Sequence, residues 1–165
     1  MRVYVPATLA MLQHLVADRL LHARSGTAFA VTPALRESYA EGDDDELADV
    51  ALRDAALASL RLLSGEGISD LPPRRAVVVA AVEGVTARPD LDDAVVRLSG
   101  PIAYDDVIAA YVDNADAEPA VVSAIEAIDA ADLGDEDAEF IVGDAQDHDL
   151  AWYAPQELPF LLELL

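Results

Sequence analysis

Short apolar runs that end at a proline and lead into a helical pattern recur four times along the chain. The residue before proline favours extended geometry, and proline fits the first turn of a helix because its missing N–H leaves no bond unmade. The pattern therefore predicts four strand-to-helix junctions. They lie at Val3–Pro6, Phe29–Pro33, Val96–Pro101 and Trp152–Pro155.

Residues 75–82 (RAVVVAAV) form a continuous apolar run of strand length. Such a run is typical of a central strand that is buried on both faces. Shorter apolar runs predict the remaining strands. These are Arg2–Val5, Thr27–Thr32, Ala94–Ser99, Glu139–Val142 and Leu150–Tyr153.

Apolar residues at helical spacing predict two long helices, Thr8–Leu21 with Thr8 as its cap and Asp43–Leu63 with a capping-box-like pair, Asp43 and Glu46. Four further segments have shorter helical patterns. They are Pro33–Tyr39, Tyr104–Val112, Glu118–Ala131 and Pro155–Leu165. Pro159 lies inside the last of these and is expected to break its first turn. Loops are expected at Ser64–Pro73, Gly84–Asp93 and Gly143–Asp149.

Strands that alternate with helices predict an α+β fold, built as a two-layer α/β sandwich. One interpretation is a single domain over residues 1–165. In another, residues 1–83 and 94–165 are pseudo-repeat halves, each a ferredoxin-like βαβ unit that contributes to one shared sheet. Hydrophobic residues make up 53% of the 165-residue chain, which is enough for one core.

The chain has no cysteine, so disulfides, thiolate metal sites and cysteine nucleophiles are excluded. Its first residues lack the pattern of a signal peptide, and no apolar run reaches the length that spans a bilayer. These features predict a cytoplasmic protein. Nucleophile motifs, a phosphate-binding loop and lysine are also absent from the sequence, so no cofactor is expected.

Thirty-two carboxylates against ten arginines give a net charge of -22, which is unevenly distributed. Residues 1–40 have a net charge of +2, residues 41–97 of -7, and residues 98–165 of -17 with no basic residue other than histidine. Such a surface repels DNA, RNA and anionic membranes and attracts basic proteins. Codon bias with a need for solubility is one explanation of the charge, and a charged binding face is the other.

Four segments resemble a family of uncharacterised acidic proteins from high-GC actinobacteria. They are MRVYVPATLAMLQHL, TAFAVTPALRESYAEGDDDELADVALRDAALASLRLL, RRAVVVAAVEG and LAWYAPQELPFLLELL. The resemblance implies a cytoplasmic protein with a domain of unknown function and supports codon bias as the reason for the missing lysines. It implies no activity, cofactor or partner.

Carboxylates are concentrated between residues 116 and 139, and three of them are spaced to form one helical stripe. The candidate partner-binding residues are Asp116, Glu118, Glu126, Asp129, Asp132 and Glu136. One explanation is that the stripe is simply a solvated helix face. Another is that arginines from the N-terminal part of the chain face the stripe. A basic protein partner, or mimicry of a row of nucleic-acid phosphates, are the functional explanations. Arg74 and Arg75 either lie solvated at a strand end, pair with this acidic part or contact an anion.

Oxygen and imidazole ligands cluster in the predicted loop at Asp144, Asp147, His148 and Asp149. These residue types suit a divalent metal, although the spacing is not that of an EF-hand, and a polar hairpin is the simpler interpretation. An exposed Trp152 would be an interface anchor. Exposed Leu158, Phe160, Leu161 and Leu164 would favour a homo-oligomer, or they complete the core.

Three hypotheses of function follow from these observations. The first is a non-enzymatic interaction or regulatory protein whose acidic C-terminal face binds a basic protein. The second is a nucleic-acid mimic that inhibits a DNA- or RNA-binding protein. The third is a small metal-dependent enzyme or metal-binding protein that uses residues 144–149. The sequence favours a non-enzymatic role, while carboxylate acid–base chemistry stays open.

Overall fold

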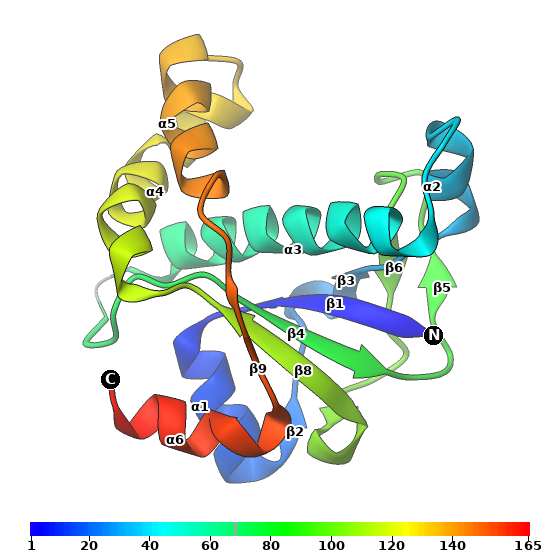
Figure 1. Cartoon of the computed structure of the whole chain (residues 1–165), viewed down its shortest axis with the longest axis horizontal. Coiled ribbons are helices and arrows are strands. Elements are labelled where there is room, and N and C mark those ends of the chain that lie inside the picture. Colours follow the sequence, from blue (N-terminus) through cyan, green and yellow to red (C-terminus); the bar gives the residue numbers. More distant parts are fainter. Residues whose placement is uncertain (68) are drawn as a thin grey trace.

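The computed structural model describes residues 1–67 and 69–165, in which the chain forms six α-helices and nine strands (Figure 1). The helices are α1 (Leu9–Asp18), α2 (Pro33–Ser38), α3 (Asp44–Glu66), α4 (Glu118–Asp132), α5 (Glu136–Gln146) and α6 (Leu158–Glu163). The strands are β1 (Arg2–Ala7), β2 (Leu20–Leu21), β3 (Thr27–Phe29), β4 (Ala76–Ala81), β5 (Thr86–Ala87), β6 (Val95–Arg97), β7 (Ile102–Ala103), β8 (Val107–Val112) and β9 (Ala151–Tyr153).

Seven strands form one antiparallel sheet in the order β5-β6-β3-β1-β4-β8-β9, and β2 pairs with β7 in a small second sheet. β4 pairs with β1 along its whole length, from Arg2 opposite Ala81 to Ala7 opposite Ala76, and with β8 on its other side. Residues 76–80 are all buried. The prediction of a central strand buried on both faces is therefore confirmed.

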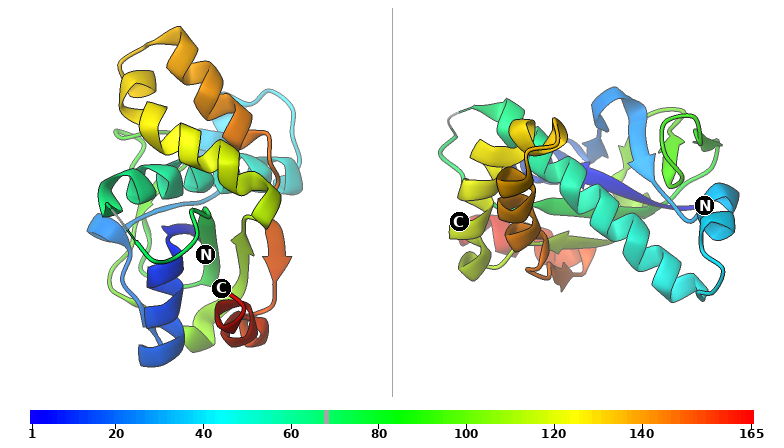
Figure 2. Two further views of the ribbon diagram at one scale, coloured as in Figure 1. Left: turned by 90° about the vertical axis from the view of Figure 1, so that its left-hand side faces the viewer. Right: turned by 90° about the horizontal axis from the view of Figure 1, so that it is seen from above.

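Helices cover both faces of the sheet (Figures 1 and 2). α1 and α6 pack on one face, where Leu12, Leu15 and Leu158 join Val5 and Val78 in the main core. α3 crosses the other face, and its small buried residues Ala51, Ala55 and Ala56 pack against Tyr4, Val77 and Val79. α4 and α5 lie beyond α3 (Figure 2). The predicted α+β class is thus confirmed, whereas helices on both faces of the sheet make more layers than the two that were expected.

The capping residues predicted the first residues of the two long helices correctly. The Thr8 hydroxyl accepts a hydrogen bond from the Met11 amide, and the Asp43 carboxylate accepts one from the Glu46 amide. The first helix ends earlier than expected, because Arg19 adopts a left-handed conformation (φ 59°) and Leu20–Leu21 pair with β7. α3 continues to Glu66, into the segment expected to be a loop.

Two segments were predicted to have the wrong type of secondary structure. Residues 107–112 form strand β8 rather than the end of a helix over Tyr104–Val112, because the VIAAYV run buries residues on both faces of the sheet. Residues 139–142 form part of helix α5 rather than a strand, because Asp135 caps a helix whose buried residues Ala138, Val142 and Ala145 recur at helical spacing.

The proline junctions have mixed outcomes. Pro33 begins α2, and Pro155 begins a 3₁₀ turn that leads into α6, as expected. Pro159 lies at the start of α6 rather than inside a longer helix. Pro6 lies within β1, and Pro101 is followed by strand β7, so the third junction is wrong. Strand β7 forms there because Ile102 and Ala103 find partners in β2.

The ferredoxin-like halves are not confirmed. β1 and β3 enclose α1 and lie side by side, and β8 and β9 enclose α4 and α5 and also lie side by side. A ferredoxin-like βαβ unit instead keeps a third strand between the two strands that flank its helix. Within the described residues, no helix combines the length and the apolarity that crossing a membrane requires.

Candidate functional site

α4 and α5 form an antiparallel helical hairpin that we call the acidic arm (residues 118–146). The arm projects beyond α3, on the side of α3 away from the sheet (Figure 2, left). Its turn contains Gly134 at φ 94°, a left-handed conformation that L side chains rarely adopt. Asp135 then caps α5 by accepting a hydrogen bond of 2.9 Å from the Ala138 amide.

The base of the arm is held by a small hydrophobic cluster. Val121, Ala124 and Ile128 of α4 face Val142 and Ala145 of α5. Leu60 and Leu63 of α3 complete the same cluster. The arm is therefore fixed to the C-terminal half of α3 by apolar packing.

The outer surface of the arm mixes carboxylates with large apolar side chains. Leu133 is 89% exposed, Phe140 75%, Val122 45% and Ile141 38%. Val122, Glu126, Asp129 and Leu133 follow the i, i+4, i+7, i+11 spacing of one helix face, so apolar and acidic groups alternate along it. Apolar side chains exposed together often mark a protein–protein interface.

A buried ion pair joins the sheet to the end of the arm. Arg75 and Asp113 are 1% and 0% exposed. The Arg75 guanidinium donates from Nε and Nη2 to the two Asp113 oxygens, at 2.9 and 2.7 Å. It also donates from Nη1 to the Gln146 side-chain oxygen at 2.8 Å and from Nη2 to the His148 carbonyl at 2.9 Å. Arg75 therefore locks the C-terminal end of α5 to β4 and β8.

Two more arginines hold the acidic arm from the N-terminal part of the chain. Arg74 donates to Glu118 at the start of α4, with Nη2–Oε2 at 3.0 Å. Arg61 of α3 forms a bidentate pair with Asp132 at 3.0 and 2.9 Å. This hydrogen bonding lowers the pKa of the Asp132 carboxyl and raises the pKa of Arg61. The interpretation that arginines pair with the acidic part therefore holds for Arg61, Arg74 and Arg75.

The six predicted partner-binding residues fall into two groups. Glu118 and Asp132 are neutralised by the arginines just described. Asp116, Glu126, Asp129 and Glu136 are exposed, and none forms an ion pair with another described residue. The exposed apolar residues of the arm were missed, because Phe140 and Ile141 lay in a segment assigned to a strand. Their helical register after the Asp135 cap is the signal that could have found them.

The four candidate metal ligands do not lie in the expected hairpin loop. Asp144 lies in α5, Asp147 follows its last residue, and His148 and Asp149 lead into β9. The loop expectation was wrong because α5 extends through Gln146. Among residues 1–67 and 69–165 no group of three or more His, Asp or Glu side chains is placed to hold a metal ion.

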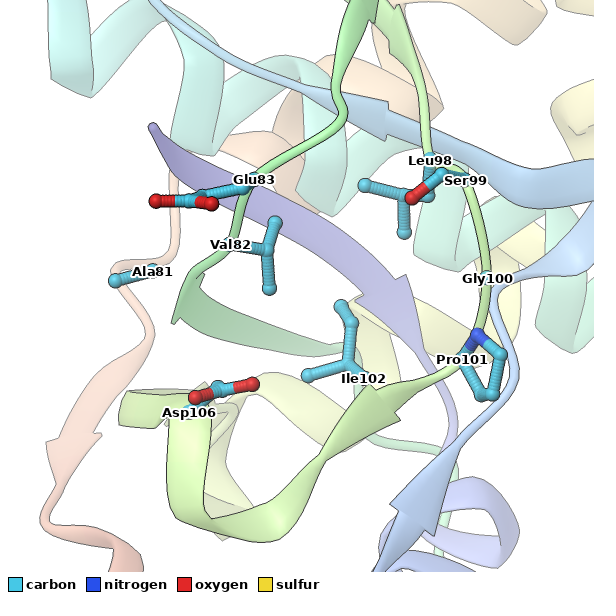
Figure 3. Close-up of a pocket in the computed structure, with 9 residues that line it drawn as sticks. All are labelled: Ala81, Val82, Glu83, Leu98, Ser99, Gly100, Pro101, Ile102 and Asp106. Atoms are coloured by element: carbon cyan, nitrogen blue, oxygen red, sulfur yellow. The ribbon is translucent and has the colours of Figure 1, made fainter.

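A hollow of about 470 Å³ lies where β4 ends, between residues 81–83 and the segment 98–102 (Figure 3). Val82 and Ile102 point into this space, whereas Glu83 points away from it (Figure 3). Asp106 and Ser99 supply the other polar side chains of the lining. The described residues give this hollow no basic side chain.

Trp152, Phe160 and Leu164 are 57%, 69% and 85% exposed, whereas Leu158 and Leu161 are buried. Trp152 lies on β9, an outer strand of the large sheet. The closing helix thus completes the core with one side and leaves apolar side chains on the other. Trp152 is exposed, which is the condition under which we expected it to be an interface anchor. The homo-oligomer stays a prediction.

No curated protein and no solved structure matches the chain. A family model matches residues 1–162, which confirms the resemblance to an uncharacterised family. The chain belongs to this family, DUF6912, a family of unknown function.

Proposed function

We propose that the protein is a non-enzymatic, cytoplasmic interaction protein whose acidic arm docks a basic, amphipathic segment of a partner protein. The observation that carries this proposal is the exposure of Phe140 and Leu133 among carboxylates. Solubility or codon bias accounts for carboxylates on a surface, but neither accounts for a phenylalanine that is 75% exposed in their midst.

The chemistry of the partner follows from the surface. Glu126, Asp129 and Glu136 attract arginine and lysine side chains and speed up association. Leu133 and Phe140 bury apolar side chains of the partner once it is bound, which supplies affinity that salt does not screen. A basic amphipathic helix presents both kinds of group at matching spacing.

The arm also has the rigidity that a docking surface needs. Its base is packed on α3, and the Arg61, Arg74 and Arg75 contacts fix both of its helices to the body of the protein. A fixed surface loses little conformational entropy on binding.

The proposal is tested by capturing partners from a lysate of the source cells on immobilised protein. Four forms are compared. They are the wild type, an arm variant (Glu126→Gln, Asp129→Asn, Glu136→Gln), Phe140→Ser, and a control variant with the same net charge as the arm variant (Glu41→Gln, Asp70→Asn, Glu163→Gln). We expect the wild type and the control variant to capture a basic protein. The arm variant and Phe140→Ser should not capture it. Equal capture by all four proteins would contradict the proposal.

Competition separates ordinary docking from nucleic-acid mimicry. A partner that the acidic arm holds in place of DNA or RNA is released by duplex nucleic acid. A partner that binds the arm through Phe140 and Leu133 stays bound when duplex is added at the same ionic strength.

A further inference from the structure

A second hollow, of about 270 Å³, lies between α3 and the segment that joins α5 to β9. It is distinct from the exposed face of the acidic arm. Its lining combines apolar side chains with charged groups of both signs. The lining is formed by Asp49, Leu52, Arg53, Ala56, Arg75, Gln146, His148, Asp149 and Leu150.

Arg75 lines this hollow and has one N–H group for which no hydrogen bond is found in the part of the chain that the structure describes. A guanidinium has five N–H groups. Four of them donate to Asp113, Gln146 and the His148 carbonyl, and within the described residues the second N–H of Nη1 has no acceptor. Nη1 lies against Gln146, which itself lines the hollow. A buried donor without an acceptor is unfavourable, so an acceptor supplied by a ligand is favoured there.

Arg53 adds a full positive charge to the same wall. It is exposed, and no carboxylate lies within ion-pair distance of it among the residues that the structure describes. The Arg53 backbone carbonyl accepts a hydrogen bond from the Gln146 side-chain amide, which ties α3 to α5 beside the hollow. Arg53 and the Arg75 donor together suit a carboxylate.

Negative charge lies close by on the same lining. Asp49 is one helical turn before Arg53 on α3, so the two side chains are neighbours on its surface. Asp149 belongs to the lining from the segment that joins α5 to β9, next to Leu150. These two carboxylates oppose a simple anion but suit a molecule that carries an ammonium group beside its carboxylate. Leu52 and Leu150 offer apolar surface to the rest of such a molecule.

We propose that this hollow binds a small zwitterion of the α-amino acid class with an apolar side chain. The ligand carboxylate pairs with Arg53 and takes the remaining Arg75 donor. The ligand ammonium lies between Asp49 and Asp149. The side chain packs on Leu52 and Leu150.

The test is calorimetric titration of the full chain with leucine, supported by the NMR signal of the indole N–H of Trp152. This is the only tryptophan in the chain, and it lies two residues beyond Leu150. Two analogues isolate the charges: 4-methylpentanoic acid lacks the ammonium group, and 3-methylbutylamine lacks the carboxylate. We expect leucine to bind at least about tenfold more tightly than either analogue, since each lost charge-assisted hydrogen bond costs about that factor.

Single variants assign the contacts. Arg53→Gln and Asp149→Asn should each weaken leucine binding about tenfold, while the control Arg24→Gln, an exposed arginine outside this lining, should leave it unchanged. Binding of 4-methylpentanoic acid as tightly as leucine, leucine binding that survives both variants, or no leucine binding would each overturn the proposal. None of these results bears on the acidic arm, because the partner capture uses a different surface.

Discussion

At the scale of single residues, a buried ion pair and one partly buried carboxylate determine how the protein responds to substitution and to pH. Arg75 and Asp113 are buried and form an ion pair, and Arg75 also donates to Gln146 and to the His148 carbonyl. Asp54 on α3 is half-buried near Asp92 and Asp93. The charges of Arg75 and Asp113 compensate each other within the fold, whereas burial of the charged Asp54 carboxylate is unfavourable.

Removing the cation of the buried pair should cost far more than removing an exposed one. Arg75→Met leaves Asp113 charged and unpaired, which should lower the free energy of unfolding by about 3–5 kcal/mol. Arg88→Met breaks the exposed pair with Asp90 and should change the free energy of unfolding far less, because water screens this pair. Urea unfolding of both variants measures the difference. Equal losses for the two variants would mean that the buried pair does not hold the fold as described.

Asp54 should make the protein less stable as the pH rises. Burial, with Asp92 and Asp93 nearby, raises the pKa of Asp54 to about 6, against about 3.9 in an unfolded chain. The folded state therefore binds this proton more tightly, and stability is lost between about pH 4 and pH 6. Asp54→Asn should remove this loss of stability between pH 4 and pH 6. It should also raise the free energy of unfolding at pH 7 by about 1–2 kcal/mol.

Urea unfolding at a series of pH values between 4 and 7 follows this effect. The matched control is Asp70→Asn, which removes an exposed carboxylate other than Asp54, Asp92 and Asp93. Its stability should change with pH as that of the wild type does. An unchanged slope in Asp54→Asn would show that Asp54 titrates normally in the fold.

At the scale of elements, the signals that the sequence reveals are the local ones. Caps such as Thr8 and Asp43 and the apolar run of β4 are recognisable because a few neighbouring residues determine them. β8 and α5 were misassigned because short apolar segments fit a strand or a helix equally well, and tertiary packing decides between them. The charge of the arm was readable, but the exposure of Phe140 and the partners of Arg75 depend on distant contacts.

Two glycines of the arm should respond in opposite directions. Gly143 lies inside α5 with open space around the position of an added Cβ, so Gly143→Ala should raise the free energy of unfolding by about 0.5–1 kcal/mol. Gly134 has φ 94°, so Gly134→Ala should lower it by about 1–2 kcal/mol. Thermal unfolding followed by circular dichroism measures both. Destabilisation by Gly143→Ala would argue for the strand-and-loop assignment of this segment over helix α5.

At the scale of the whole molecule, excess negative charge opposes compaction. Seventeen of the 32 carboxylates lie in residues 98–165, a segment that contains no arginine or lysine. Four arginines from the rest of the chain pair with carboxylates of this segment and leave most of its carboxylates facing solvent. They are Arg19, Arg61, Arg74 and Arg75. The fold thus holds like charges together by apolar packing and a few well-placed pairs.

Added salt should therefore stabilise the protein. Sodium chloride screens the repulsion among the exposed carboxylates but has little effect on the buried Arg75–Asp113 pair. Between low salt and about 0.5 M we expect a gain of about 1 kcal/mol, or ~2–4 °C in the unfolding midpoint. A midpoint that falls with salt would mean that attractive surface pairs outweigh the repulsion.

The most direct measurement is the affinity of the protein for two synthetic helical peptides of equal positive charge. One is amphipathic, with leucines along one face, and in the other these leucines are serines. We predict that the wild type binds the amphipathic peptide at least about tenfold more tightly, and that Leu133→Ser with Phe140→Ser abolishes this preference. Equal affinity of the wild type for both peptides would show that the arm attracts positive charge without docking a partner.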